Sequence, residues 1–225
     1  MGNAKNYWPI LGNLAILANT KYWPIILTAG LFKSPLVDGE EKAIENVCKD
    51  VYSVEPLPQP TAEDVLRKLP VIEVVHFACH AFSDPTNPSN SHILLQKPGE
   101  TGLIVDRLSL SQIANVVTQG QAQIAFLSAC STAEVRASKL ADEGLHLASA
   151  FQVAGFGHVI GALWSADDDV CVRVAEIFYT NLVKADQAMC SDGVVALALR
   201  KAVLQVRSEY SSSPRLWAPF IHLGA

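Results

Sequence analysis

Short apolar runs alternate with longer segments of helical spacing along most of the chain. Residues 71–78, 123–128 and 158–163 are nearly continuous apolar runs, which are typical of strands covered on both faces. Shorter apolar runs at 25–29 and 219–223 predict two further strands. Because strands and helices alternate in this way, we predict an α/β fold with an open, mostly parallel sheet and helices on both faces.

The segments between the apolar runs predict helices. Thr61 and Asp64 form the Thr-x-x-acid pattern of a helix start, and Pro70 ends that segment. Further helices are expected at 38–48, 108–116, 142–154, 168–183 and 193–210, and brief strands at 93–96 and 103–105. Ligands of open parallel sheets bind beyond the carboxyl ends of the strands, so the residues that follow the buried runs are the first candidates for a site.

The composition favours a reduced, intracellular protein with one main domain. The 225 residues are 50% hydrophobic and carry a formal net charge of −5, with 17 basic and 22 acidic residues. This balance excludes a disordered chain and offers no basic stripe, so we expect no nucleic-acid partner. The five cysteines form no C-x-x-C pair and are odd in number, which predicts a cytoplasmic protein rather than a disulfide framework.

The N-terminal part of the chain differs from the rest. Residues 1–24 form an apolar segment of uncertain role, and the domain itself is expected at 25–225. Polar residues and prolines interrupt the apolar stretch too often for a membrane span, so none is expected. An apolar segment that is not buried in the fold normally marks a contact site, which favours a partner surface here.

Two residues with the chemistry of a nucleophile and its base follow two of the buried runs. His80 comes just after residues 71–78, and Cys130 just after residues 123–128. Neighbouring strands lie about 4.8 Å apart, so the two side chains can meet across one or two strand widths. An imidazole beside a thiol can take its proton and form the nucleophilic thiolate. The backbone N–H groups of Cys130 and Ala81 are placed to donate to the oxyanion that such a reaction forms.

Each of these residues also has a structural interpretation. A single cysteine at a strand end is most often part of the core, and a single histidine beside a strand is most often structural. A metal site at His76 and Cys79 is not expected, because a strand directs these two residues to opposite faces. We therefore expect no metal and no cofactor. Cys48, Cys171 and Cys190 are interpreted as packing residues.

Five motifs follow one another along the chain: His76-Phe77-Ala78-Cys79-His80, Ser128-Ala129-Cys130-Ser131-Thr132, Asp142-Glu143-Gly144, Ala154-Gly155-Phe156 and Leu163-Trp164. In this order they resemble the CHAT domain, and their sequences are most similar to those of fungal members. The resemblance covers about residues 25–225 and ends in a stretch similar to the family's last strand. CHAT domains belong with the caspases, metacaspases and separases. The resemblance therefore implies a caspase-like fold in which His80 and Cys130 match the catalytic dyad.

Two positions depart from the family pattern. The residue after the dyad histidine is Ala81 where the family usually has glycine, which matters only if the position needs a positive φ. Separase-like relatives carry an acid directly after Leu-Trp, whereas this chain has Ser165 there and acids at Asp167, Asp168 and Asp169. We interpret these acids first as the start of a helix. The alternative is a substrate pocket for a basic side chain, formed by Asp167 and Asp168.

The leading hypothesis is a cysteine endopeptidase that acts on a protein or peptide substrate in regulatory proteolysis. The alternative from another class is an interaction or signalling module of the same fold that cleaves little. Such a module would normally be coupled to a tetratricopeptide-repeat or sensor partner. Thiol labelling and peptide cleavage distinguish the two hypotheses.

Overall fold

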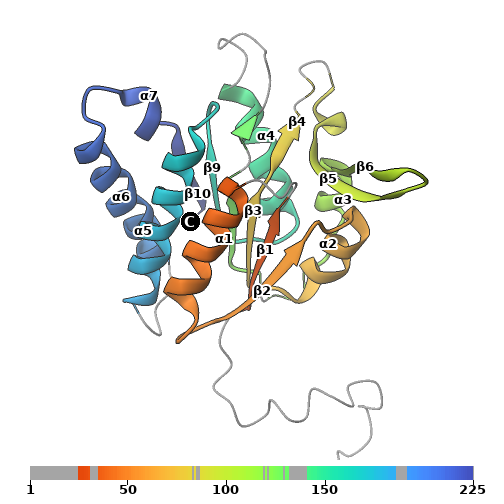
Figure 1. Cartoon of the computed structure of the whole chain (residues 1–225), viewed down its shortest axis with the longest axis horizontal. Coiled ribbons are helices and arrows are strands. Elements are labelled where there is room, and N and C mark those ends of the chain that lie inside the picture. The colour runs from red at the N-terminus through yellow and green to blue at the C-terminus, as the bar shows by residue number, and fades with distance from the viewer. Residues whose placement is uncertain are drawn as a thin grey trace, which may run out of the picture.

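The computed structural model describes residues 25–30, 35–82, 84, 87–118, 120, 122–128, 130–131, 141–185 and 192–224. These residues form an α/β fold with two sheets and helices on both sides of the larger one (Figure 1). The predicted fold class is confirmed. The apolar segment 1–24 lies outside the described residues.

A six-stranded sheet forms the centre of the fold, with the order β10-β9-β7-β3-β1-β2. Its strands are β1 (Ile25–Gly30), β2 (Ser53–Pro58), β3 (Val74–Ala78), β7 (Ile124–Leu127), β9 (His158–Ala162) and β10 (Phe220–Gly224). All neighbouring strands are parallel except β9 and β10. The three nearly continuous apolar runs are the neighbouring strands β3, β7 and β9, as their composition predicted.

Two groups of helices cover the two faces of this sheet. One group is α1 (Pro35–Cys48), α5 (Asp168–Val183), α6 (Asp192–Glu209) and the short α7 (Pro214–Trp217). The other group is α2 (Ala62–Lys68), α3 (Leu110–Ala114) and α4 (Ala141–Val153). Successive strand residues pack on opposite faces: Val74 and Phe126 belong to the core under the first group, and Val75 and Phe77 to the core under the second. Strands β3 and β7 are therefore buried on both faces.

Local sequence signals set the ends of several elements. At α2, Thr61 Oγ1 accepts from the Asp64 N–H at 3.1 Å, and Asp64 Oδ2 accepts from the Thr61 N–H at 3.1 Å, so the predicted cap is a complete capping box. After α4 the chain turns at Gly155, whose φ is +107°. A side chain there would also clash with Thr118 Oγ1, so glycine is the residue that fits the turn into β9.

A second sheet of four strands extends from the carboxyl ends of β3 and β7. Its order is β6-β5-β4-β8, with β4 (His80–Phe82), β5 (His92–Gly99), β6 (Gly102–Ser109) and β8 (Cys130–Ser131). Cys79 alone separates β3 from β4. Figure 1 shows β4 at the upper edge of the sheet and the β5–β6 hairpin projecting from the body of the molecule. We call these four strands the small sheet.

The expected elements differ from the structure in a few places. The edge strand β2 was missed, because its sequence SVEPLP contains two prolines, which are tolerated at a sheet edge but do not signal a strand. The strand expected at 71–78 begins at Val74, since Leu69–Val71 forms a short 3-10 helix. Another such turn, Pro88–Asn90, lies between β4 and β5. In the described part of the chain, no helix is both long and apolar enough to cross a membrane.

Candidate active site

The structure brings the two principal candidate residues to adjacent positions. β4 and β8 are parallel neighbours, and His80 lies opposite Cys130 in their register. This alignment continues that of the strands below, because β3 and β7 are also parallel neighbours, with Phe77 opposite Leu127. The sequence predicted a separation of one or two strand widths, and the strands that carry the two residues are direct neighbours.

Unpaired polar atoms lie beside this pair of strands. Nδ1 of the half-buried His80 is buried and has no hydrogen-bond partner among the described residues. The same holds for Oγ of Ser128, a residue that is 8% exposed and lies two positions before Cys130. Buried polar groups are normally hydrogen-bonded. The edge therefore has hydrogen-bonding capacity that the described part of the fold leaves unused.

Ala81 adopts an ordinary strand conformation. Among the described residues, Gln59 is the only non-glycine residue with a positive φ. Ala81 pairs with Ile93 of β5 on one side and with Ser131 of β8 on the other. The alanine at this position therefore introduces no left-handed backbone, and the departure from the usual glycine is mild.

The acidic run lies at the start of α5. Asp167 is the N-cap residue, Asp168 and Asp169 are in the first turn, and all three are exposed. Negative side chains are favourable at a helix N-terminus, in agreement with the first interpretation of this run. Because α5 follows β9, and β9 is the neighbour of β7, the acids also lie at the carboxyl edge from which β8 extends.

Comparison with known proteins agrees with this arrangement. The family model of the CHAT domain matches the chain over residues 26–225. The chain belongs to the CHAT domain family. CHAT domains are a caspase-like peptidase family, and the resemblance inferred from the motifs is thereby confirmed. The fungal type and the association with tetratricopeptide repeats stay predictions. No curated protein matches the chain.

His76 lies in the core of this CHAT domain, on β3, the strand that leads to His80. Its Nε2 is 3.0 Å from Glu40 Oε1, a contact that is not aligned as a hydrogen bond, and its Nδ1 is 3.2 Å from the Tyr179 hydroxyl. Its ring stacks on Phe126, with 4.7 Å between the ring centroids. His76 is fully buried by these contacts, so it has a structural role.

The structure provides no metal centre among the described residues of the CHAT domain. No three His, Cys, Asp or Glu side chains gather there in a group that could hold a metal ion. His76 and Cys79 lie on opposite sides of the sheet, because Cys79 packs among the residues under α2, α3 and α4. Cys48 and Cys171 are buried in the other core, and burial raises the pKa of Cys48 to about 12. Cys190 lies outside the described residues.

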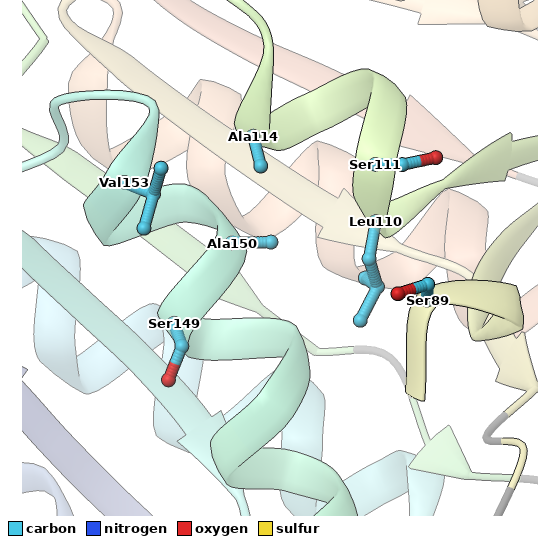
Figure 2. Close-up of a pocket in the computed structure, with 7 residues that line it drawn as sticks. All are labelled: Ser89, Leu110, Ser111, Ala114, Ser149, Ala150 and Val153. Carbon is cyan, nitrogen blue, oxygen red and sulfur yellow. The ribbon is translucent and has the colours of Figure 1, made fainter. Parts of the chain in front are cut away.

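A shallow pocket of about 220 Å³ lies between the Pro88–Asn90 turn, α3 and α4 of the CHAT domain (Figure 2). Its lining is formed by small and apolar side chains: Ser89, Leu110, Ser111, Ala114, Ser149, Ala150 and Val153. Neither His80 nor Cys130 belongs to this lining. The pocket is therefore separate from the candidate dyad.

Sequence reasoning missed two features near the candidate dyad. Glu40 lies near the start of the helix expected at 38–48, and nothing in its sequence context signals its contact with His76 on β3. The hairpin next to β4 was seen only as two brief strands. Its signal is the Gly99–Gly102 turn, which β5 and β6 close with paired glycines.

Proposed function

We propose that this CHAT domain is a cysteine endopeptidase with Cys130 as the nucleophile and His80 as the general base and then the general acid. The observation that carries the proposal is the register that places His80 opposite Cys130 on adjacent parallel strands. Residues opposite one another in such a register share a face of the sheet. A thiol and an imidazole on adjacent strands can approach closely enough for proton transfer, which supports the proposed dyad.

In the proposed reaction, His80 takes the thiol proton, and the thiolate sulfur forms a bond to the carbonyl carbon of the scissile peptide. The N–H groups of Ala81 and Cys130 donate to the resulting oxyanion. His80 then gives the proton to the leaving nitrogen as the C–N bond breaks, which leaves a thioester. Water attacks the thioester, His80 takes a proton from that water, and the acid product and the thiol are released.

The unpaired atoms at this edge support the proposal. His80 Nδ1 and Ser128 Oγ have no partner among the described residues, although both are buried. A buried polar atom without a partner is costly, by about 1–3 kcal/mol, so such atoms gather where a ligand or reacting group supplies the partner. A peptide group bound over Cys130 would supply polar atoms at this edge.

A thiol-reactive probe tests the nucleophile. Iodoacetamide-alkyne at pH 7 is expected to label the wild type and not Cys130→Ala, whereas Cys190→Ala is the matched control and keeps the label. His80→Ala is expected to slow the labelling at pH 7, because no base remains to form the thiolate. Equal labelling of the wild type and Cys130→Ala would overturn the assignment of the nucleophile.

A peptide library distinguishes the peptidase from the signalling module. We expect cleavage by the wild type and none by Cys130→Ala. Labelling of Cys130 without cleavage of any peptide would support the interaction or signalling module, coupled to a repeat or sensor partner. The library also tests the substrate pocket at Asp167 and Asp168: a preference for Arg or Lys before the cleaved bond that Asp167→Asn abolishes, and Asp169→Asn does not, would assign it.

A further inference from the structure

The small sheet has one face that carries His80 and another that belongs to the core. Ala81 of β4 pairs with Ile93, which is fully buried, so the neighbouring residues His80 and Phe82 are directed to the opposite face. The ring of Phe82 lies 5.1 Å from the ring of His92 on that same side. We call the side that carries His80, Phe82 and His92 the outer face.

On the outer face of the β5–β6 hairpin, His92 and Gln96 of β5 are buried, and the large exposed aliphatic side chains lie on β6. The register places Leu94 opposite Arg107, Gln96 opposite Val105 and Pro98 opposite Leu103 on this face. Leu103 is 53% exposed and Val105 is 57% exposed. The core face of the same hairpin holds Ile93, Leu95 and Leu108, all fully buried. Adjacent exposed aliphatic side chains of this kind mark a contact surface.

This surface is within reach of a peptide bound at the dyad. Extending the β4–β5 register by one residue places His80 level with Leu94, and Arg107 follows on the next strand. With about 4.8 Å between strands and 3.3 Å per residue, Val105 and Leu103 lie roughly 12–16 Å from His80. An extended peptide covers that distance in about four or five residues.

The exposed positive charge of Arg107 indicates which kind of side chain the bound peptide carries. Arg107 is exposed and lies between His80 and Val105 on the outer face, and no described carboxylate pairs with it. The nearest acid in the sequence, Asp106, points to the other face, where its carboxylate accepts from the Ala62 N–H at 2.8 Å and pairs with Lys97 at 3.1 Å. An acidic side chain is the natural partner for the exposed guanidinium.

We propose that Arg107, Val105 and Leu103 form an accessory docking site for the substrate polypeptide. The occupant is an extended segment that carries an acidic side chain and then aliphatic side chains, about four or five residues from the cleaved bond. This inference rests on the proposed peptidase function. A substrate segment is the occupant that the structure favours, because these residues lie on the face of the small sheet that carries His80, and because the exposed Arg107 there offers a positive charge. Pairing of another strand with the edge of β6 is disfavoured, because α2 approaches this edge at Asp106.

Peptide binding to the Cys130→Ala protein tests the docking site without requiring catalysis. Three fluorescein-labelled peptides of 12 residues would be compared by anisotropy: one with Asp and alternating Val, one with Ser in place of Val, and one with Lys in place of Asp. We expect the first to bind at least tenfold more tightly than the other two. The double variant Leu103→Thr/Val105→Thr is expected to remove the preference for Val, and Arg107→Gln the preference for Asp.

Ile104→Thr is the matched control, because Ile104 lies on the same strand, is 48% exposed and faces the other side. Equal affinity for the three peptides, or an equal effect of Ile104→Thr, would overturn the docking site. A dimer of the wild type in sedimentation that the double variant dissociates would also overturn the docking site, because this face would then be the interface between two copies. Iodoacetamide labelling of the wild type tests the dyad separately, so failure of the docking site and failure of the peptidase function are distinguishable.

Discussion

His80 lies opposite Cys130 because the parallel pairing of β3 and β7 continues beyond the core into β4 and β8. The strands below the pair are completely buried, with Phe77 and Phe126 at 0% exposure. A register that starts in such a core cannot slip by one residue without moving every side chain to the wrong face. The relative position of the two residues is therefore set by the packing of the core strands that precede them.

Residues that act as one catalytic unit are expected to give non-additive effects. If His80 serves only to activate Cys130, the double variant His80→Ala/Cys130→Ala should cleave a reporter peptide as slowly as Cys130→Ala alone. Single-turnover cleavage rates measure this directly. His222→Ala, on β10 at the far edge of the large sheet, is the control and should leave the rate unchanged. A further loss in the double variant would indicate that His80 acts independently of the cysteine.

Restoring the usual glycine after the dyad histidine should bring no gain. Ala81 already has a permitted backbone conformation, so Ala81→Gly relieves no strain and adds the conformational entropy of glycine to the unfolded chain. We expect a loss of about 0.5–1 kcal/mol in the free energy of unfolding and a labelling rate of Cys130 within twofold of the wild type. A labelling rate tenfold faster than that of the wild type would show that the alanine constrains the oxyanion loop.

Hydrophobic patterning sufficed for the large sheet and its covering helices. β3, β7 and β9 are buried on both faces, and this produces the long apolar runs from which they were predicted. The antiparallel direction of β10 was not predictable from Phe220–Gly224, because a short strand has the same composition in either direction. Strand direction depends on the connection through α6 and α7, and hence on packing far from the strand itself.

The dyad could be proposed from the sequence, but the short strands β4 and β8 that carry it could not be predicted. β8 has two residues and β4 has three, which is too short for any periodic pattern to show. These strands exist because β3 and β7 end side by side and their chains continue together. The contact between Glu40 and His76 likewise depends on α1 crossing the sheet, since the two residues are 36 positions apart (76 − 40).

The buried contact between Glu40 and His76 should contribute to stability only as a pair. Removing one partner leaves the other without compensation in the core, so Glu40→Leu and His76→Phe should each lower the free energy of unfolding by about 1–3 kcal/mol. The double variant replaces both polar groups by apolar ones and should cost less than the sum of the two. Urea unfolding of the wild type, the two single variants and the double variant measures the interaction free energy in a double-mutant cycle. Simple additivity would mean that the two side chains do not interact.

The capping box of α2 should stabilise the fold in a pH-dependent way. The hydrogen bonds from Thr61 lower the pKa of Asp64, so this contribution is present above the carboxylate's ordinary pKa and is lost as the pH falls through the lowered value. Thr61→Ala should cost about 1 kcal/mol at pH 7, measured by urea unfolding, and less below about pH 4. The box of α3 uses Ser109 and Gln112, which do not titrate, so Ser109→Ala should cost the same at both pH values. A constant cost for Thr61→Ala would contradict the role of the carboxylate.

The thiol of Cys48 should make the fold less stable in mild alkali. Burial raises its pKa to about 12, whereas a cysteine in the unfolded chain ionises near about pH 8.5. The unfolded state therefore loses a proton that the native state keeps, and the free energy of unfolding falls as the pH rises from about 9 towards 12. The limiting slope for one such group is about 1.4 kcal/mol per pH unit.

Urea unfolding between pH 7 and 10 measures the slope for the wild type and Cys48→Ala, and the variant should show the shallower decline. Val174→Ala is the matched control, because it also removes a fully buried side chain from the same core but no titrating group, so its cost should be equal at every pH. The range below about pH 10 separates the effect of Cys48 from that of Tyr179, because tyrosine ionises in the unfolded chain only at about pH 10. Burial raises the pKa of Tyr179 well above its usual value in the fold. Parallel slopes for the wild type and Cys48→Ala would show that the thiol is not held in its neutral form by the core.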